Sequence, residues 1–510
     1  MPALTSTVRP LKRKFFERYT ADQCIEDAEV IAQLAITRGW RGLRQSLFGC
    51  HTMAPIHRFS REILTNIFLL YPLESSSGHW SQGKFVRPSP CKAPLVFTHV
   101  CKAWREIAIS IPALWSSIDV HFSDKIPRSV ASSLVDFAGI WLRRSGDLPL
   151  SLSITVRKHP DAALPVLALF FRCVPRWQHI RWWVESDEAV RDSPPFMVLQ
   201  GPASRLETLE ISTAGFISQN LSIPLNSIMN SAPRLRQCSF THLVPHYELP
   251  RRIISLPVSQ LTHLRLEDFQ SVDDCLEILR DSRQLIECDL DLGRLFECST
   301  STFSRTPILL SELRSLQIRT RSGISNLMNY LTLSSLSDLT IHFESDVFRY
   351  QNDTLWPQSQ FISLIRRSSC SLTRLHFKSV PLSEENLLQC LKHTTVSLKE
   401  LHIEDERPLT CVSDTVLTRL SHRGSGRGQR PLLCPQLHTF RFSRCASFTM
   451  GVFANMVESR VSAAQIVNPL NPHFRCVCPK NIEVAMITWS DRLEILRVEG
   501  LQLKIAILPA

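Results

Sequence analysis

The pattern Leu-x-x-Leu-x-Leu, in which other aliphatic or aromatic residues sometimes replace Leu, recurs along this chain from Leu206 onward. Its first positions between Leu206 and Leu336 are separated by 29, 26, 24, 28 and 23 residues. Each copy predicts a short strand whose Leu side chains stack on those of the next copy, while the intervening segment returns along the outer side. The chain is therefore expected to be an α/β protein, with a curved parallel sheet and helices on its outer side.

The copies extend almost to the C-terminus, although their spacing becomes irregular. Their key positions are Leu206/Leu209/Ile211, Leu235/Cys238/Phe240, Leu261/Leu264/Leu266, Leu285/Cys288/Leu290, Leu313/Leu316/Ile318, Leu336/Leu339/Ile341, Leu372/Leu375/Phe377, Leu398/Leu401/Ile403, Leu437/Phe440/Phe442 and Leu493/Leu496/Val498, after a degenerate copy at Trp177/Ile180/Trp182. The later separations of 36, 26, 39 and 56 residues predict insertions or copies that the pattern does not reveal. Two return segments, Ser271 to Arg280 and Ser383 to Leu391, begin with a capping residue and place Leu residues on one helical face.

A separate apolar region, from Ile56 to Trp115, precedes the repeats and is divided by a polar loop. Ser60 is suited to cap a helix that runs to Leu70, and Pro94 is suited to open a second helix. The apolar stripes are Ile63, Leu64, Ile67 and Phe68 in the first helix and Phe97, Val100, Cys101, Trp104, Ile107 and Ala108 in the second. Helices this short do not bury their apolar faces alone, so the rest of the chain or another protein must cover them.

The same residues resemble the F-box of fungal F-box proteins of the basidiomycete type. The resemblance lies in Glu62-Ile63-Leu64, in Ile67-Phe68 and in the later run Val100-Cys101-Lys102-Ala103-Trp104-Arg105. The chain departs from the family at Phe59-Ser60, where Leu-Pro is expected. The resemblance extends to the stretch from Trp141 to Leu152, and the repeats that follow are similar to leucine-rich repeats.

This resemblance implies a non-catalytic substrate-recognition subunit of a Skp-cullin-F-box ubiquitin ligase. In that family the F-box helices dock on a Skp-type adaptor, and through it on a cullin, while the repeats hold a target protein. The residues expected to bind the adaptor are Ile63, Leu64, Ile67, Phe68, Val100 and Trp104. The sequence leaves open which of these side chains face the adaptor and which form the core of the helical region.

Four segments follow from these patterns. Residues 1–53 are expected to form a basic tail and a short helix, residues 54–118 the F-box, residues 119–200 a connecting α/β segment, and residues 201–510 the repeat solenoid with a flexible loop near residues 421–431. Within the connecting segment, alternation predicts strands at Ile118 to Val120 and at Leu150 to Val156. Helical spacing predicts a helix from Ser129 to Arg144, and Gly146 is suited to end it.

Charged residues flank the buried Leu positions and are expected on the open face of the sheet, where repeat proteins commonly bind partners. The candidates for binding a target protein are Arg265, Glu267, Glu287, Asp289, Asp291, Arg319, Arg374 and Lys378. Their mixed signs suit a protein partner better than nucleic acid, which requires a dominant positive sign. Two alternatives stay open: a repeat scaffold without ligase coupling, and a nucleic-acid binder, which the net charge of +11 motivates.

The sequence contains no arrangement that predicts catalysis. It has no glycine-rich phosphate loop and no nucleophile or zinc-protease motif, so we expect neither an enzyme nor a bound cofactor. The 16 cysteines include no CxxC pair, and Cys476 and Cys478 near His473 lack a second pair of ligands for a metal. No apolar run is long enough to span a membrane, so the protein is expected in the cytoplasm or the nucleus.

Overall fold

The computed structural model describes residues 59–71, 85–122, 128–157, 160–184, 200–213, 219–242, 256–267, 272–292, 306–321, 324–344, 356–404, 411–421, 432–443, 446–465, 481–485 and 502–506. The predicted N-terminal tail and helix, the loop at 422–431 and the repeat copy at Leu493 lie outside these residues. The chain divides into two compact units, Met1–Arg234 and Leu235–Ala510. Each unit is described by itself.

The first unit begins with short helices. These are α3 (Arg61–Leu70), α4 (Leu95–Val100), α5 (Lys102–Ile109) and the 3-10 helix η2 (Pro112–Trp115). Ser60 caps α3 as predicted, because its hydroxyl oxygen accepts a hydrogen bond from the backbone N–H of Ile63 at 3.4 Å.

The prediction of a single helix after Pro94 is wrong, because the helix is interrupted at Cys101. This residue adopts extended backbone, with φ −157° and ψ 174°, and separates α4 from α5. Its sulfur accepts a hydrogen bond from the backbone N–H of Trp104 at 3.5 Å. Cys101 therefore acts as the N-cap of α5, a role that its apolar neighbours in the sequence do not suggest.

Three aromatic side chains form the core of this helical region. Phe68 of α3 stacks on Phe97 of α4 with ring centroids 4.2 Å apart. Trp104 of α5 meets Phe68 edge-on at 4.9 Å and Phe97 at 6.1 Å. All three are buried, and edge-to-face contacts of this kind stabilise a core beyond the burial of area alone.

Strands and helices alternate through the rest of the first unit. They are β1 (Ser117–Phe122), α6 (Arg128–Arg144), β2 (Leu150–Val156), α7 (Pro160–Phe171), η3 (Val174–Arg176), β3 (Trp177–Val184), β4 (Thr208–Thr213) and α9 (Gln219–Asn230). The strands are parallel in the order β1-β2-β3-β4. The two predicted strands and the helix between them are confirmed, and Gly146 has the φ of +55° that a left-handed residue after a helix requires.

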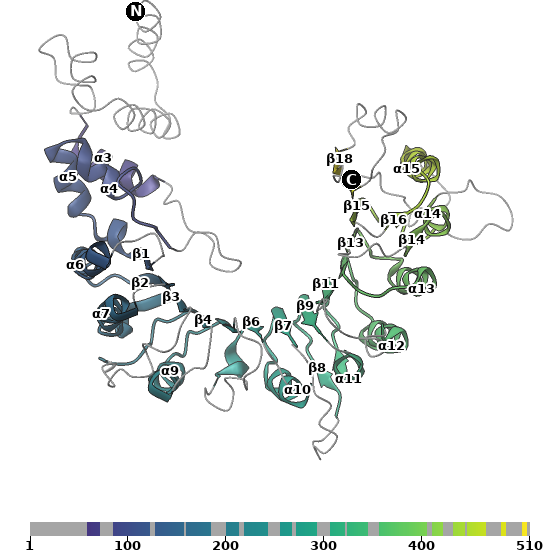
Figure 1. Ribbon diagram of the computed structural model, residues 1–510, viewed down its shortest axis with the longest axis horizontal. Coiled ribbons are helices and arrows are strands. Elements are labelled where there is room, and N and C mark those ends of the chain that lie inside the picture. Colours follow the sequence, from purple (N-terminus) through teal and green to yellow (C-terminus); the bar gives the residue numbers. More distant parts are fainter. Residues whose placement is uncertain are drawn as a thin grey trace, which may run out of the picture. The chain divides into compact units, whose positions relative to one another are not determined.

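The second unit continues the alternation of strand and helix. Its elements are β5 (Gln237–His242), η5 (Val258–Gln260), β6 (His263–Leu266), α10 (Val272–Asp281), β7 (Glu287–Asp291), β8 (Ile308–Leu309), β9 (Ser315–Thr320), α11 (Ser325–Tyr330), β10 (Leu331–Thr332), β11 (Asp338–Phe343), α12 (Gln358–Ser368), β12 (Arg374–Lys378), α13 (Glu384–Thr394), β13 (Glu400–Glu404), β14 (Val412–Ser413), α14 (Asp414–Leu420), β15 (Thr439–Ser443), β16 (Ala446–Ser447), α15 (Met450–Gln465), β17 (Asn481–Ala485) and β18 (Gln502–Ala506). The main sheet of this unit is parallel, in the order β5-β6-β7-β9-β11-β12-β13-β15-β17-β18. Its helices lie along one side of the strands (Figure 1). The predicted α/β architecture, a parallel solenoid-like sheet with helices on one side, is confirmed.

The repeated Leu positions stack from strand to strand in the second unit. The middle position of each copy is the register partner of the next, through Leu264, Cys288, Leu316, Leu339, Leu375, Leu401 and Phe440. All of these side chains are buried, and each buried side chain of this size contributes roughly 1.5–3 kcal/mol relative to an exposed one. β17 lies in the long interval between Leu437 and Leu493, where the spacing predicted either an insertion or an unrecognised copy. β18 pairs with β17 at the end of the sheet.

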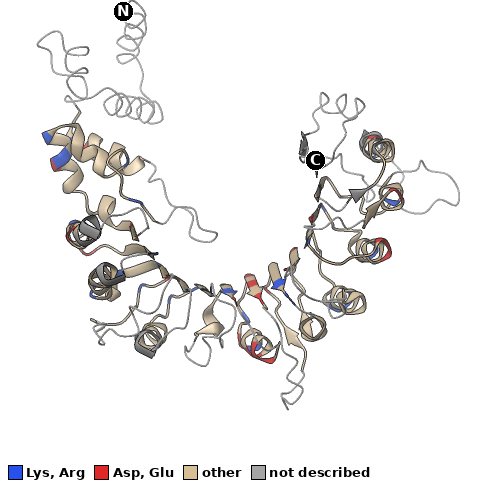
Figure 2. Cartoon of the chain, in the orientation of Figure 1, with Lys and Arg blue, Asp and Glu red and all other residues tan. Residues whose placement is uncertain are grey.

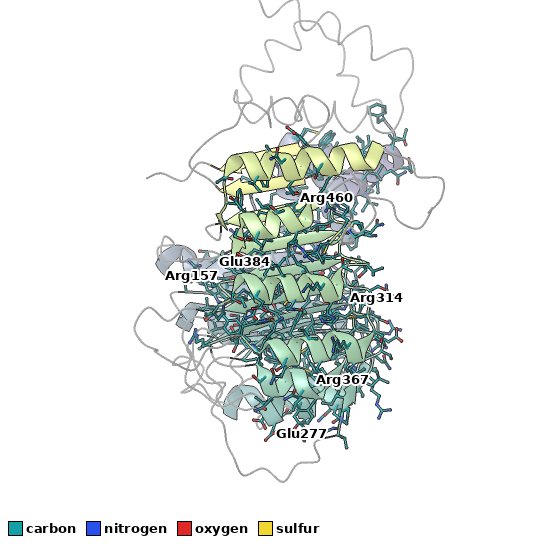
Figure 3. All side chains as sticks on the ribbon, turned by 90° about the vertical axis from the view of Figure 1, so that its right-hand side faces the viewer. Arg157, Glu277, Arg314, Arg367, Glu384 and Arg460 are labelled. Carbon is teal, nitrogen blue, oxygen red and sulfur yellow. The ribbon has the colours of Figure 1, made fainter. Side chains whose placement is uncertain are left out.

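Two arginines of the second unit, both labelled in Figure 3, donate hydrogen bonds to backbone carbonyls outside their own helices. Arg460 of α15 is fully buried and donates hydrogen bonds to the carbonyls of Leu420, Cys434 and Leu437 at 3.0, 2.7 and 3.0 Å. Arg367 of α12 donates to the carbonyl of Leu331 at 2.6 Å, just beyond the end of α11. The last carbonyls of a helix have no partner within it, so each guanidinium joins one repeat to the next.

Candidate protein-interaction surfaces

α3 carries a buried apolar stripe and, beside it, an exposed one. Leu64 and Phe68 are buried, whereas Ile63 and Leu70 are 45% and 57% exposed and Ile67 is half-buried. Because successive helical residues are about 100° apart, Ile63, Ile67 and Leu70 share one face, which we call the α3 stripe. Adjacent apolar side chains left in solvent are typical of a surface that binds a partner.

The six residues predicted to bind the adaptor therefore have different positions in the structure. Leu64, Phe68 and Trp104 are buried within the helical region, Ile67 and Val100 are half-buried, and Ile63 is exposed. Leu70 was not among the predicted residues, although its spacing of seven from Ile63 places it on the same helical face.

The helical region and the first strands share one core. The indole N–H of Trp115 in η2 donates to the carbonyl of Ala108 at 2.8 Å, and that of Trp141 in α6 donates to the carbonyl of Ser117 at 2.9 Å. The two indoles pack edge-on with centroids 4.8 Å apart, and the guanidinium of Arg144 covers Trp115 at 4.4 Å. The α3 stripe is thus attached to the α/β part of the first unit through packed aromatic side chains.

The segment that leads into α4 is fastened to β1. The backbone N–H of Asp119 donates to the carbonyl of Val86 at 2.8 Å, and the backbone N–H of Val86 donates to the hydroxyl of Ser117 at 3.0 Å. Phe85 is fully buried, with the guanidinium of Arg181 over its ring at 4.4 Å. This segment accordingly holds the second half of the helical region against the sheet of the first unit.

A buried carboxylate completes this attachment. Asp119 accepts a hydrogen bond from Nε2 of His121 at 2.7 Å and lies 3.3 Å from Nη2 of Arg87. Burial alone would raise the pKa of the Asp119 carboxyl, but the hydrogen bond and charge of His121, together with Ser153 and Arg87, outweigh it and lower the pKa to about 2. Asp119 is therefore ionised at neutral pH and binds Arg87 electrostatically.

The face of the second unit's strands opposite the buried Leu rows, which we call the inner face, carries both signs of charge (Figure 2). Arg319 of β9 lies 2.9 Å from Glu267, 3.5 Å from Asp289 and 3.8 Å from Asp291. Arg265 of β6 contacts Glu267 at 2.8 Å and Asp289 at 3.4 Å. Burial alone would lower the pKa of the Arg319 guanidinium, but the three surrounding carboxylates outweigh it and raise that pKa. Five of the predicted target-binding residues therefore form one network.

The other three predicted target-binding residues lie outside that network. Arg374 of β12 pairs with Asp338 of β11 and, at 3.0 Å, with Glu400 of β13, so it bridges three strands. Glu287 of β7 lies 3.9 Å from Nε2 of His263. Lys378 lies at the end of β12, and within the described part of the chain no carboxylate pairs with it.

Two histidines of the inner face were missed by the sequence reading, which considered only charged residues there. His376 of β12 and His402 of β13 are register partners with ring centroids 5.4 Å apart. Their Nε2 atoms lie 3.6 Å from Glu404 and 3.8 Å from Glu400, respectively. Burial, reinforced by His376 and Arg441, lowers the pKa of His402 to about 4, so His402 is neutral at pH 7. The signal that could have found them is the His placed between two buried apolar residues in each strand.

Neither a metal site nor a membrane span is found in the described residues. No group of three or more His, Cys, Asp or Glu side chains in these ranges could hold a metal ion. No described helix is both long enough and apolar enough to cross a bilayer.

The comparisons with known proteins assign no family. No family model matches the sequence, and no curated protein matches it. Among solved structures, the chain is similar to a protein of Bacteroides fragilis of known crystal structure, with 10% identity and a TM-score of 0.30 over 69% of this chain and 81% of that one. A likeness of this size carries no argument about function.

Proposed function

We propose that this chain is a non-catalytic, substrate-recruiting subunit of a Skp-cullin-F-box ubiquitin ligase. The observation that carries the proposal is the α3 stripe: Ile63 and Leu70 stay exposed on a helix whose neighbouring stripe, Leu64 and Phe68, is buried. A helix that only completed its own core would not need this second apolar face. The resemblance of these residues to an F-box names the partner as a Skp-type adaptor.

In this proposal the chain performs no chemistry itself. The adaptor and cullin bring a ubiquitin-charged enzyme, and this chain holds a target protein near it, which raises the effective concentration of the target's lysines. The packing of Trp115 on Trp141 supports this role, since it joins the α3 stripe firmly to the first strands.

The inner face of the second unit is the proposed target-binding surface. Most of its charges are already paired, as Arg319 is with Glu267, so those side chains are held in place before a target arrives. A target with complementary charges must compete with these pairs, which favours specificity over raw affinity. The mixed signs also supply no continuous positive track for nucleic acid.

The test is binding of the full chain to a purified Skp-type adaptor. Replacing both Leu64 and Ile67 by Asp would give an ambiguous result. Leu64 is only 4% exposed, so an aspartate there would disrupt the core as well as any binding surface. Ile63→Asp and Leu70→Asp place charge only on exposed positions of the α3 stripe, and each is expected to abolish or greatly weaken adaptor binding while leaving the fold intact.

Leu69→Asp is the matched control. Leu69 belongs to the same helix and is 49% exposed, but it lies about 100° away from Leu70 around the axis. We expect Leu69→Asp to bind the adaptor nearly as well as the unchanged chain. Equal binding by all three variants, or no binding by the unchanged chain, would overturn the proposal and favour a repeat scaffold without ligase coupling.

A further inference from the structure

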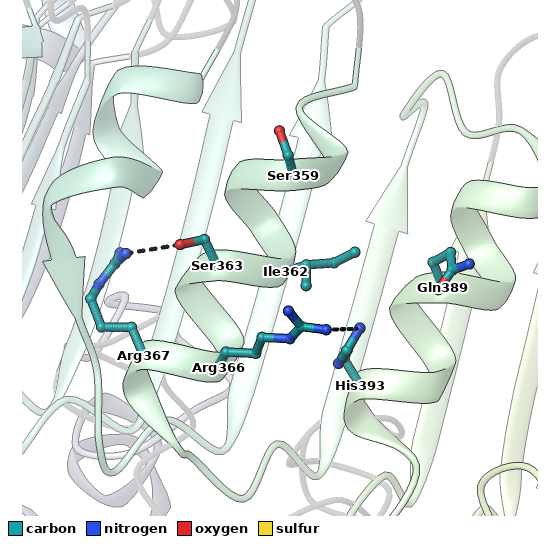
Figure 4. A pocket seen from close by; sticks show the side chains of 7 residues that line it. All are labelled: Ser359, Ile362, Ser363, Arg366, Arg367, Gln389 and His393. Carbon is teal, nitrogen blue, oxygen red and sulfur yellow. Dashed lines mark hydrogen bonds between the residues drawn. The ribbon is translucent and has the colours of Figure 1, made fainter.

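A groove runs between α12 and α13 on the helical side of the second unit (Figure 4). It has a volume of about 670 Å³ and is lined by Ser359, Ile362, Ser363, Arg366, Arg367, Gln389 and His393. Ile362 and Arg366 extend from α12 toward α13, whereas Arg367 turns away toward Ser363 (Figure 4). Since Arg367 is occupied by the carbonyls of the preceding repeat, the groove proper lies between Ile362 and Arg366 on one wall and Gln389 and His393 on the other.

The electrostatics of this groove have one sign. None of its lining residues is acidic, and within the described part of the chain no carboxylate pairs with Arg366. Instead, Nη2 of Arg366 lies 3.4 Å from Nε2 of His393, so the guanidinium donates to a neutral imidazole. Burial, together with the charges of Arg366 and Lys392, lowers the pKa of His393 and keeps it neutral. An anion between the two side chains would give the guanidinium a negatively charged partner in place of the neutral imidazole.

The spacing of Ile362 and Arg366 along α12 fits an extended peptide. Ile362 and Arg366 are four residues apart on a helix, which corresponds to about 6 Å along its axis. Side chains two residues apart in an extended chain point to the same side and are separated by about 6.6 Å. A peptide with an apolar residue, any residue, and then an anionic residue would thus place its apolar side chain on Ile362 and its anion between Arg366 and His393, with its backbone beside Gln389.

We propose that the α12–α13 groove binds an extended peptide segment with the pattern apolar, any residue, anionic, the anion being a side-chain carboxylate. This surface lies on the helices and not on the inner face, so the inference is independent of the ligase proposal. It gives the protein a second docking surface for a partner that presents an acidic tail or loop.

The test uses fluorescent peptides with Gly-Ser flanks around Leu-Ala-Glu, Leu-Ala-phosphoserine or Leu-Ala-Gln, and it measures anisotropy with the full chain. Both anionic peptides are expected to bind at least about tenfold more tightly than the Gln peptide, because a charge-assisted hydrogen bond is lost in the latter. Binding of the phosphoserine peptide together with a Glu peptide that binds no more tightly than the Gln peptide would overturn the assignment of the anion as a carboxylate. Equal affinity for all three peptides, or no binding at millimolar concentration, would overturn the proposal.

Two substitutions separate the groove from general attraction to a basic helix end. Arg366→Gln should weaken binding of the anionic peptides at least about tenfold and leave the affinity for the Gln peptide unchanged. Ile362→Ser should weaken binding of all three peptides by the same factor, because all three carry the same Leu. Lys392→Gln is the matched control, because it removes the same charge one residue from His393 but outside the lining of the groove. If Lys392→Gln weakens the anionic peptides as much as Arg366→Gln does, the groove is not a site. Arg366 and Lys392 are both exposed, so the variants should unfold like the unchanged chain.

Discussion

Asp119→Asn tests how firmly the helical region is fastened to the first unit. The pKa of the Asp119 carboxyl falls from the ordinary value of 3.8 to about 2 in the folded chain. Since one pKa unit corresponds to about 1.4 kcal/mol, the ionised carboxylate stabilises the folded state by about 2 kcal/mol. Its side chain is 1% exposed, so solvent screening reduces this value little. At pH 7 the variant should therefore lose about 2 kcal/mol of the free energy of unfolding.

The dependence on pH has a definite sign. Because the folded pKa lies below the unfolded one, this stabilisation is fully present above about pH 4 and is lost as the pH falls toward 2. At pH 3 the difference between the two chains should shrink to about half of its value at pH 7. The titratable groups that face the carboxylate are His121 and Arg87.

Urea unfolding monitored by tryptophan fluorescence measures this difference. Eight of the ten tryptophans, at positions 40, 80, 104, 115, 141, 177, 182 and 183, lie within Met1–Arg234, so the signal reports mainly on the first unit. Asp136→Asn makes the same chemical change at an exposed position of α6 and should change the free energy of unfolding by less than about 0.5 kcal/mol. A loss of stability at Asp119 no larger than at Asp136, or a difference that stays constant from pH 7 to pH 3, would show that the ionised Asp119 carboxylate does not stabilise the folded state.

Two further substitutions test the cores of the units. Phe68→Ala removes a fully buried ring that stacks on Phe97 and should lower the free energy of unfolding, measured with urea, by about 3–5 kcal/mol. Leu70→Ala changes an exposed position and should lower it by less than about 0.5 kcal/mol. Equal costs would show that α3 buries the other face. Arg460→Met leaves several backbone carbonyls without a donor and should cost about 3 kcal/mol or more, detected as faster amide hydrogen exchange in α14 and α15. Unchanged exchange there would contradict the role of Arg460 in joining the last helices.

The strands of both units were readable from the sequence because their signal is local. Each copy of the Leu pattern places buried side chains at fixed intervals, and the cap predicted at Ser383 is present, with its hydroxyl accepting the backbone N–H of Asn386 at 3.1 Å. The break at Cys101 was not readable, since apolar residues continue with helical spacing on both sides of it. Extended backbone at one residue leaves no trace in such a periodicity.

The candidate surfaces were readable only in part because they depend on contacts between distant residues. Ile63 and Leu64 are adjacent and both strongly apolar, and which of them is buried depends on how α3 packs in the folded chain and not on either residue alone. The charges of the inner face were predicted, but their pairing follows from strand register, as between Arg374 and Glu400, which are 26 residues apart. The groove between α12 and α13 depends on how two helices pack, which no single segment determines.

The most direct test of the central claim is the mass of the complex that the full chain forms with a purified Skp-type adaptor, measured by light scattering after size-exclusion chromatography. We expect a complex with one copy of each protein. We also expect Ile63→Asp to yield the two proteins as separate species and Leu69→Asp to preserve the complex. Separate elution of the unchanged chain and the adaptor, or a complex that persists with Ile63→Asp, would contradict the assignment of the α3 stripe as the docking surface.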